Sequence, residues 1–123
     1  MTALGILLIS GGHERAHYAL MLATAAAALG RPVTLFATNG GCRLLLAGAP
    51  LERDPHEAEL ARAGVATIAT LMEAARALEI RCIACEAGLR AEGLEEEPLA
   101  RGAEVAGIVT FLGAVGTGQV ISL

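Results

Sequence analysis

Short strand-like segments that lack a regular polar alternation constrain the fold of this chain more than any other feature. They are residues 4–10, 32–38, 80–84, 103–106 and 119–122. A strand in a half-exposed sheet alternates apolar and polar side chains, whereas a strand buried on both faces does not. Segments with helical spacing separate these strands, which is typical of a parallel sheet covered on both faces. The predicted class is therefore α/β, with three layers and a mainly parallel sheet of about five strands.

The helical segments begin and end at recognisable signals. They are residues 13–29, 67–78, 86–92 and 108–115. Gly30 and Gly93 stop the first and third of these segments, and Thr67 or Thr70 with Glu73 forms a possible capping box at the second. Residues 49–64 contain Pro50 and Pro55 among mainly small and charged residues, so we expect an exposed loop or lid there.

Length and composition limit the classes of function. The 123 residues fit one domain, which we expect to span residues 1–123. Hydrophobic residues make up 54% of the chain, and this apolar surplus suggests a homo-oligomer in which partner subunits cover part of the surface. The net charge of -4 and the absence of a basic cluster argue against a nucleic-acid partner. Every basic residue other than histidine is arginine, which excludes Schiff-base lysine chemistry and a Walker lysine.

The apolar segments do not predict a stable membrane span. Residues 18–29 are too short, and residues 105–123 are broken by several glycines. The N-terminus lacks the basic region and the cleavage site of a secretory signal, so secretion is not expected. Three cysteines are too few for a disulfide scaffold, which favours a reducing cytoplasm.

Most of the chemically versatile side chains follow predicted strands. In an open parallel sheet, ligands bind outside the carboxyl ends of the strands, where helix N-termini present free N–H groups. The segments at that edge are residues 10–17, residues 38–42, residues 85–88 and Gly107. Two of the three cysteines and two of the three histidines fall in them. This edge is the expected functional site.

The string HERAH at residues 13–17 matches the H-E-x-x-H pattern of zinc metalloproteases. In such proteases both histidines lie within a helix that is backed by a substrate cleft, whereas His13 directly follows a strand and two glycines. Chance is one interpretation of the string. Metal binding by His13 and His17 with Cys85 or Cys42 is another, and proteolysis lacks the structural context that it requires.

The three cysteines differ in where they lie relative to the predicted strands and helices. Cys82 and Cys85 form a C-x-x-C, but within a strand their Cα atoms would be roughly 10 Å apart, and a disulfide tolerates about 7 Å. Cys82 is therefore predicted to be a small core residue. Cys85 lies where the next helix begins, a position that favours a nucleophilic thiolate although Glu86 opposes it. Position alone leaves open whether Cys85 is reactive or only packs under the helix; Cys42, after a Gly-Gly loop, is the weaker candidate for a second thiol.

The string ISGGHERAHYALMLATAAAALGRPVTLFATNGG, the segment IRCIACEAGLRAEGLEEE and the block AGIVTFLGAV follow one another along the chain. In this order they resemble the DsrE/DsrF-like sulfur-relay family, in particular its DsrE2-like branch. The resemblance implies a YchN-like α/β fold, frequent homo-oligomers and passage of sulfane sulfur as a cysteine persulfide. The family's sulfur-carrying cysteine falls on Cys85, and its polar turn before the first helix falls on Gly12, His13 and Glu14. The strand ending LFATNGG and the compact residues 49–64 depart from the pattern of that branch.

Two functional hypotheses follow. In the first, Cys85 accepts sulfane sulfur from a donor protein or a low-molecular-weight persulfide and surrenders it to an acceptor thiol, with His13 or His17 moving a proton and no metal or organic cofactor required. In the second, the sheet edge is a module that binds a small ligand or a metal through His13 and His17 with a cysteine, and has no catalytic activity. The first hypothesis predicts loss of function on removal of Cys85, whereas the second predicts loss of ligand on removal of a histidine.

Overall fold

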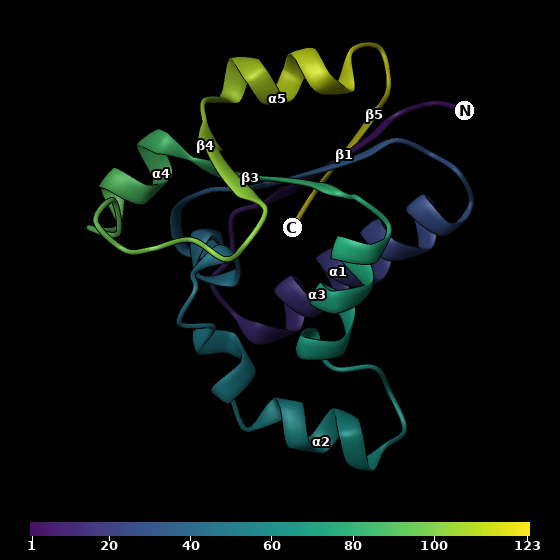
Figure 1. Cartoon of the computed structure of the whole chain (residues 1–123), viewed down its shortest axis with the longest axis vertical. Coiled ribbons are helices and arrows are strands. Elements are labelled where there is room, and N and C mark those ends of the chain that lie inside the picture. The colour runs from purple at the N-terminus through teal and green to yellow at the C-terminus, as the bar shows by residue number, and fades with distance from the viewer.

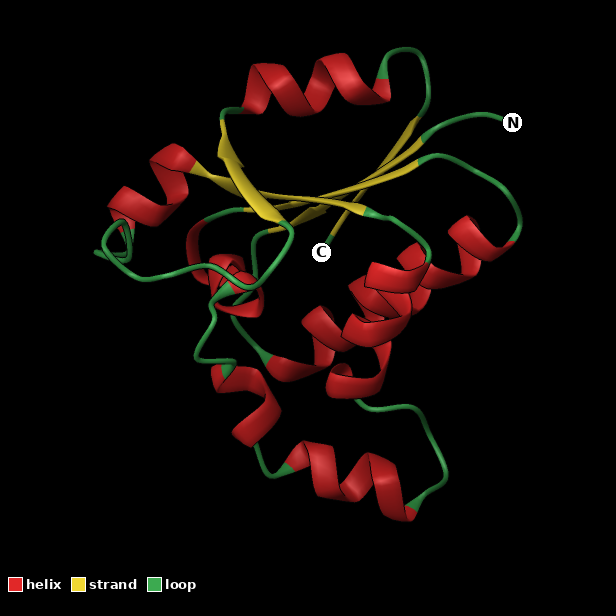
Figure 2. Cartoon of the chain, in the orientation of Figure 1, coloured by secondary structure: helices red, strands yellow, loops and turns green.

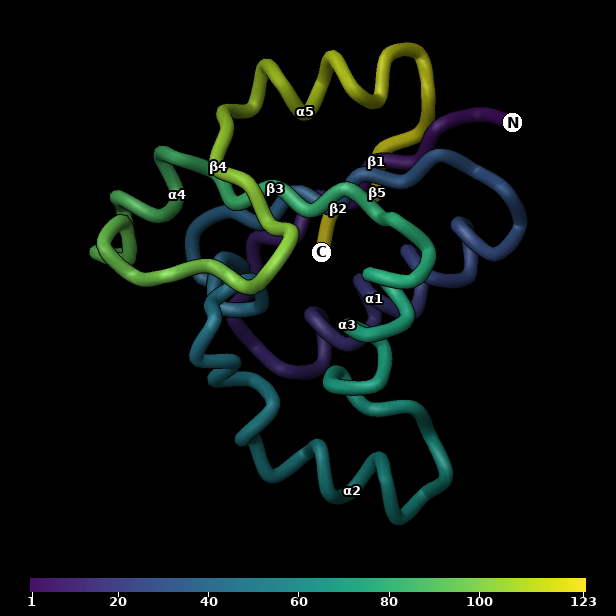
Figure 3. The backbone as a smooth tube through the Cα atoms, viewed as in Figure 1, coloured from purple at the N-terminus to yellow at the C-terminus, as the bar shows by residue number.

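The computed structural model describes residues 1–123 and is organised around a five-stranded sheet in the order β4-β3-β2-β1-β5. The strands are β1 (Leu4–Leu8), β2 (Val33–Ala37), β3 (Arg81–Cys85), β4 (Ala103–Ala106) and β5 (Gln119–Ser122). Every neighbouring pair is parallel. The predicted α/β class is confirmed, and the sheet is parallel throughout. In Figure 3 the backbone trace shows the last strand, β5, beside the first strand, β1.

Helices lie on both faces of this sheet and give the predicted three layers (Figures 1 and 2). They are α1 (His13–Ala28), α2 (His56–Arg62), α3 (Ile68–Ala77), α4 (Glu86–Ala91) and α5 (Ile108–Val115), with two 3-10 helices, η1 (Asn39–Leu45) and η2 (Pro50–Arg53). Helices α1 and α3 cover one face, and α5 covers the other. No helix combines the length and the apolarity that crossing a membrane requires.

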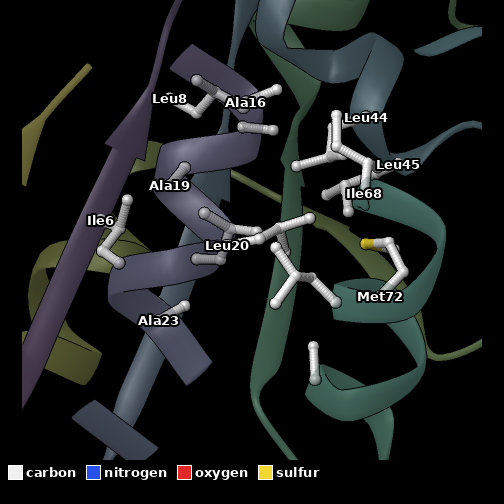
Figure 4. Close-up of a cluster of buried hydrophobic side chains, with 14 of the residues drawn as sticks. Ile6, Leu8, Ala16, Ala19, Leu20, Ala23, Leu44, Leu45, Ile68 and Met72 are labelled. Atoms are coloured by element: carbon white, nitrogen blue, oxygen red, sulfur yellow. The ribbon is translucent and has the colours of Figure 1, made fainter. Parts of the chain in front are cut away.

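The larger core fills the space between the sheet and the α1–α3 layer (Figure 4). Ala16, Ala19 and Ala23 of α1 are fully buried. Because these side chains are small, the helix backbone lies close to the sheet, and the long side chains of its neighbours fill the remaining space. Figure 4 shows Leu20 of α1 pointing toward the side chains of α3. The low aromatic content of the sequence is therefore compatible with a packed core on this face.

A smaller core lies under α5 and holds both phenylalanines of the chain. The rings of Phe36 and Phe111 stack with centroids 4.9 Å apart. A Cβ on Gly5 would come within 2.4 Å of Val115 Cγ2, so a glycine is required where α5 crosses β1. The last residue of β3, Cys85, belongs to this cluster. The candidate nucleophile thus packs in the core that lies under α5.

The segment that was predicted to be an exposed loop, residues 49–64, is exposed but largely helical. It contains η2 and α2, and no residue of α2 is buried. The Asp54 carboxylate accepts the backbone N–H of His56 at 2.9 Å and so turns the chain into α2. The prediction of a loop is therefore wrong in secondary structure, because both prolines lie at helix starts, where proline is compatible with a helix.

Candidate functional site at the carboxyl ends of the strands

Glycines bring together the loops that follow β1 and β2. A Cβ on Gly41 would lie 2.2 Å from the carbonyl oxygen of Leu8, and a Cβ on Gly11 would lie 3.0 Å from the carbonyl oxygen of Gly40. Backbones can approach this closely only where no side chain intervenes. Gly88 of α4 has the same role, because a Cβ there would lie 2.3 Å from Thr38 Oγ1. The sheet edge predicted from sequence therefore forms one packed group of loops.

Cys85 is the last residue of β3 and the N-cap of α4. Its Sγ accepts the backbone N–H of Gly88 at 3.3 Å. The residue is 7% exposed, so it is largely but not fully buried. This is the strand-to-helix position that the sequence predicted, and it directs one peptide N–H at the sulfur atom. The same contact is available to an anionic sulfur species.

Cys42 lies in η1 and is fully buried near Cys85. Burial, and next the charge of Cys85, raise the pKa of the Cys42 thiol to about 11, although the Cys85 backbone N–H acts in the opposite direction. The Cys42 thiol also donates to the Ala37 carbonyl at 3.5 Å. The structure therefore brings the two thiols of the predicted site together, with Cys42 held in the protonated form at neutral pH.

Cys82 is partly buried within β3 and packs on the sheet face opposite to Cys85. Burial raises the pKa of its thiol to about 11. Residues three apart on a strand point to opposite faces, so the C-x-x-C does not form a dithiol. All three cysteines are free.

His13 and His17 stack on each other, with ring centroids 6.2 Å apart. His13 Nε2 hydrogen-bonds to Glu57 Oε1 at 2.7 Å, and His17 Nε2 donates to the carbonyl oxygen of Ala66 at 2.9 Å. His13 thus contacts α2, and His17 contacts the loop between α2 and α3. No hydrogen bond joins either ring to Cys85. The two imidazoles are brought together as their spacing indicates, but their Nε2 atoms are occupied by structural partners.

Glu57 connects three helices and was missed by the sequence analysis. Besides His13 of α1, its carboxylate accepts the backbone N–H groups of Ile68 at 2.9 Å and Ala69 at 3.3 Å, at the N-terminus of α3. Burial opposes ionisation of Glu57, but the hydrogen bonds from His13 and from these N–H groups outweigh it and hold its pKa below the usual value. Nothing in the sequence marks this residue, because its partners lie 11 to 44 positions away.

His56 completes a group of three histidines by stacking on His13, with centroids 5.5 Å apart. Its Nδ1 hydrogen-bonds to Asp54 Oδ1 at 2.6 Å. This contact raises the pKa of His56, and hydrogen bonds from the His56 backbone and ring lower the pKa of Asp54. Glu14, exposed in the first turn of α1, adds a small further contribution to the raised pKa of His56.

Gly12 precedes α1 as its N-cap and donates its N–H to Ser10 Oγ at 3.1 Å. It therefore shapes the polar turn that the sequence indicated. No group of three or more histidine, cysteine, aspartate or glutamate side chains is placed to hold a metal ion. The H-E-x-x-H string accordingly supplies a helix start and two buried rings in this fold.

We expect Glu57→Gln to destabilise the fold by about 1–2 kcal/mol at neutral pH, because charge-assisted hydrogen bonds to α1 and α3 become neutral ones. The pKa of Glu57 is lowered from its ordinary value of 4.5. Its contribution is therefore fully present above that pH and declines as the pH falls through the lower pKa of the folded state. Urea unfolding of both proteins at a series of pH values measures the difference.

Glu59→Gln is the matched control, since Glu59 lies on the same helix and is exposed. It should change the free energy of unfolding by less than about 0.5 kcal/mol. A difference between wild type and Glu57→Gln that stays constant through the acidic range would contradict the lowered pKa.

The model of the DsrE/DsrF-like family matches residues 3–123. The structure is similar to that of the ychN protein from E. coli, with a TM-score of 0.75, 19% identity and full coverage of both chains. It is also similar to MTH1491 from Methanobacterium thermoautotrophicum, a protein of unknown function, with a TM-score of 0.60, 15% identity and full coverage of both chains. No curated protein sequence matches the chain.

Proposed function

The chain belongs to the DsrE/DsrF-like family, and from this premise we propose that it is a sulfur carrier that holds sulfane sulfur as a persulfide on Cys85. The observation that carries the proposal is the position of this thiol. Cys85 ends β3, caps α4 and accepts the Gly88 N–H on its sulfur. The same N–H is available to stabilise the Cys85 thiolate, which attacks the donor and is released again when the sulfur is passed on.

The transfer is a pair of thiol exchange steps. The Cys85 thiolate attacks the outer sulfur of a donor persulfide, a new S–S bond forms on Cys85, and the donor leaves as a thiolate. An acceptor thiolate then attacks the outer sulfur of the Cys85 persulfide, and Cys85 leaves as a thiolate. The sulfane sulfur keeps its oxidation state throughout, so neither an oxidant nor a reductant is needed.

Burial of the neighbouring thiols supports Cys85 as the single carrier. The thiols of Cys42 and Cys82 both have a pKa of about 11, and a protonated thiol is a poor nucleophile. The 7% exposure of Cys85 also suits storage, because surrounding side chains limit the access of water and of unrelated thiols. A proton-shuttle role for His13 or His17 stays a prediction, since both Nε2 atoms have other partners.

Donor and acceptor are proposed to be persulfide-bearing and thiol-bearing proteins or small molecules, in a reducing cytoplasm where three free cysteines persist. A homo-oligomer is part of the same proposal. Apolar side chains are exposed on and around the α5 layer, where only one helix covers the sheet. They are Val105, Ile108, Val109, Leu112 and Val120. Such a surface is typical of one that a partner subunit covers.

The test is to locate the sulfur that the protein acquires. We expect wild-type protein exposed to glutathione persulfide to gain one sulfur atom, removable by dithiothreitol, and peptide mapping to find it on Cys85. Cys42→Ala should load to the same extent, because the Cys42 thiol is protonated. Absence of any added sulfur, or equal labelling of the three cysteines, would contradict the proposal.

A further inference from the structure

A cavity of about 380 Å³ lies at the opposite edge of the sheet from Cys85, by the amino ends of β3 and β4. The C-terminal half of α3 forms one wall, and the segment that leads into β4 forms the other. Its apolar lining is provided by Leu45, Met72, Ala75, Ile80, Cys82, Ala100 and Ala103. This volume lies within the range of cavities that hold small organic ligands.

Two arginines stand at this cavity without a partner of their own. Arg76 of α3 and Arg101 before β4 line the cavity, and the side chain of neither makes a hydrogen bond or an ion pair within the chain. Three other arginines, Arg43, Arg81 and Arg90, each pair with a glutamate, whereas exposed Arg15 and Arg62 do not. A guanidinium presents its N–H donors as a planar fork that matches a carboxylate. Arg76 and Arg101 therefore leave two such forks free beside an apolar cavity.

A second hollow of about 290 Å³ adjoins the first and shares Met72, Arg76, Ala100 and Arg101 with it. The two arginines thus stand between two cavities, where an anionic group can meet both. Glu79 lines the first cavity and Glu52 the second. With two arginines and Glu79, the first cavity by itself carries a net charge of +1, which favours a monoanion over a dianion there. Because the second cavity shares both arginines and adds Glu52, the two hollows together carry no net charge.

The thiol of Cys82 does not oppose an anion in this cavity. Burial raises the pKa of Cys82 to about 11, and Arg76 lowers it by a smaller amount. The thiol is thus neutral at neutral pH and acts as part of the apolar wall. The ligand that matches this environment has an apolar body for the wall and one carboxylate for the arginines.

We propose that this cavity binds a small organic monocarboxylate, with its carboxylate between Arg76 and Arg101 and its apolar body against Met72, Ile80 and Cys82. The site is separate from Cys85, because β3 and β4 place their amino ends at one edge of the sheet and Cys85 at the other. The ligand is recognised by charge at one end and by apolar contact at the other. Binding there does not require sulfur on Cys85.

The test is an NMR titration of ¹⁵N-labelled protein with hexanoate, and in parallel with hexanamide, its neutral analogue. We expect hexanoate to shift the amide signals of Arg76, Arg101, Gly102 and Ala103 saturably, and hexanamide to bind at least about tenfold more weakly. The double variant Arg76→Gln with Arg101→Gln should lose the preference for hexanoate. It should still load sulfur on Cys85, which separates failure of this proposal from failure of the sulfur-carrier proposal.

Arg62→Gln is the matched control, since Arg62 is exposed on α2 and also lacks an ion pair. It should bind hexanoate as wild type does. Equal affinity for hexanoate and hexanamide, or shifts that do not saturate, would overturn the proposal. Stronger saturable binding of inorganic phosphate at the same amides would overturn it in favour of a phosphate site.

Discussion

Cys85→Ala is expected to reduce sulfur loading from glutathione persulfide to the uncatalysed background. The reason is that Cys85 alone of the three cysteines lies at the end of a strand and caps a helix, while burial raises the pKa of the Cys42 and Cys82 thiols to about 11. Intact-protein mass spectrometry over a time course measures the loading. Cys42→Ala and Cys82→Ala should each load at the rate of wild type.

Cys85→Ser separates chemistry from stability. The Cys85 sulfur caps α4 by accepting the Gly88 N–H, so alanine also removes a cap worth about 1 kcal/mol. A serine hydroxyl retains an acceptor for that N–H but cannot form a persulfide. Loss of loading in Cys85→Ser with a thermal unfolding midpoint close to that of wild type assigns the loss to the sulfur atom. Loading that persists in this variant would contradict the proposed function.

Gly88→Ala is expected to destabilise the fold by about 3 kcal/mol, at the upper end of the usual cost of overpacking. The new Cβ would lie 2.3 Å from Thr38 Oγ1 and 2.4 Å from the backbone nitrogen of Asn39. Because Asn39 contributes backbone rather than a flexible side chain, α4 must move away from the loop after β2. That movement also carries the Gly88 N–H away from Cys85. Urea unfolding measures the first effect, and the rate of sulfur loading measures the second.

Gly113→Ala is the control for this substitution. Gly113 lies within α5, and nothing stands within 4 Å of a Cβ built there. Alanine in an open helix interior is favoured over glycine by roughly 0.5–1 kcal/mol. A Gly88→Ala protein as stable as Gly113→Ala would show that α4 and the loop after β2 pack less closely than the structure has them.

The position of Cys85 followed from local pattern. An apolar strand, a cysteine and a helix stopped by Gly93 occupy consecutive residues, and in a parallel sheet such a junction lies at the carboxyl edge wherever the strand sits in the order. The rise of a strand likewise indicated that Cys82 and Cys85 lie too far apart for a disulfide, and both are free in the structure. Both inferences concern neighbours in sequence, and they required no knowledge of the tertiary structure.

The sequence by itself thus determined the α/β class, the elements around the strand ends and the residue at the centre of the proposed site. Only the tertiary structure decided which distant groups meet there. His13 and Glu57 are 44 positions apart, Cys42 approaches Cys85 across the sheet edge, and the two arginines of the proposed carboxylate site lie on separate segments. Local periodicity reports which face of an element is buried, whereas these contacts depend on how strands are ordered and how loops pack. That packing depends on the core as a whole. Glycines are required where two backbones touch, and only the folded structure shows which backbones touch.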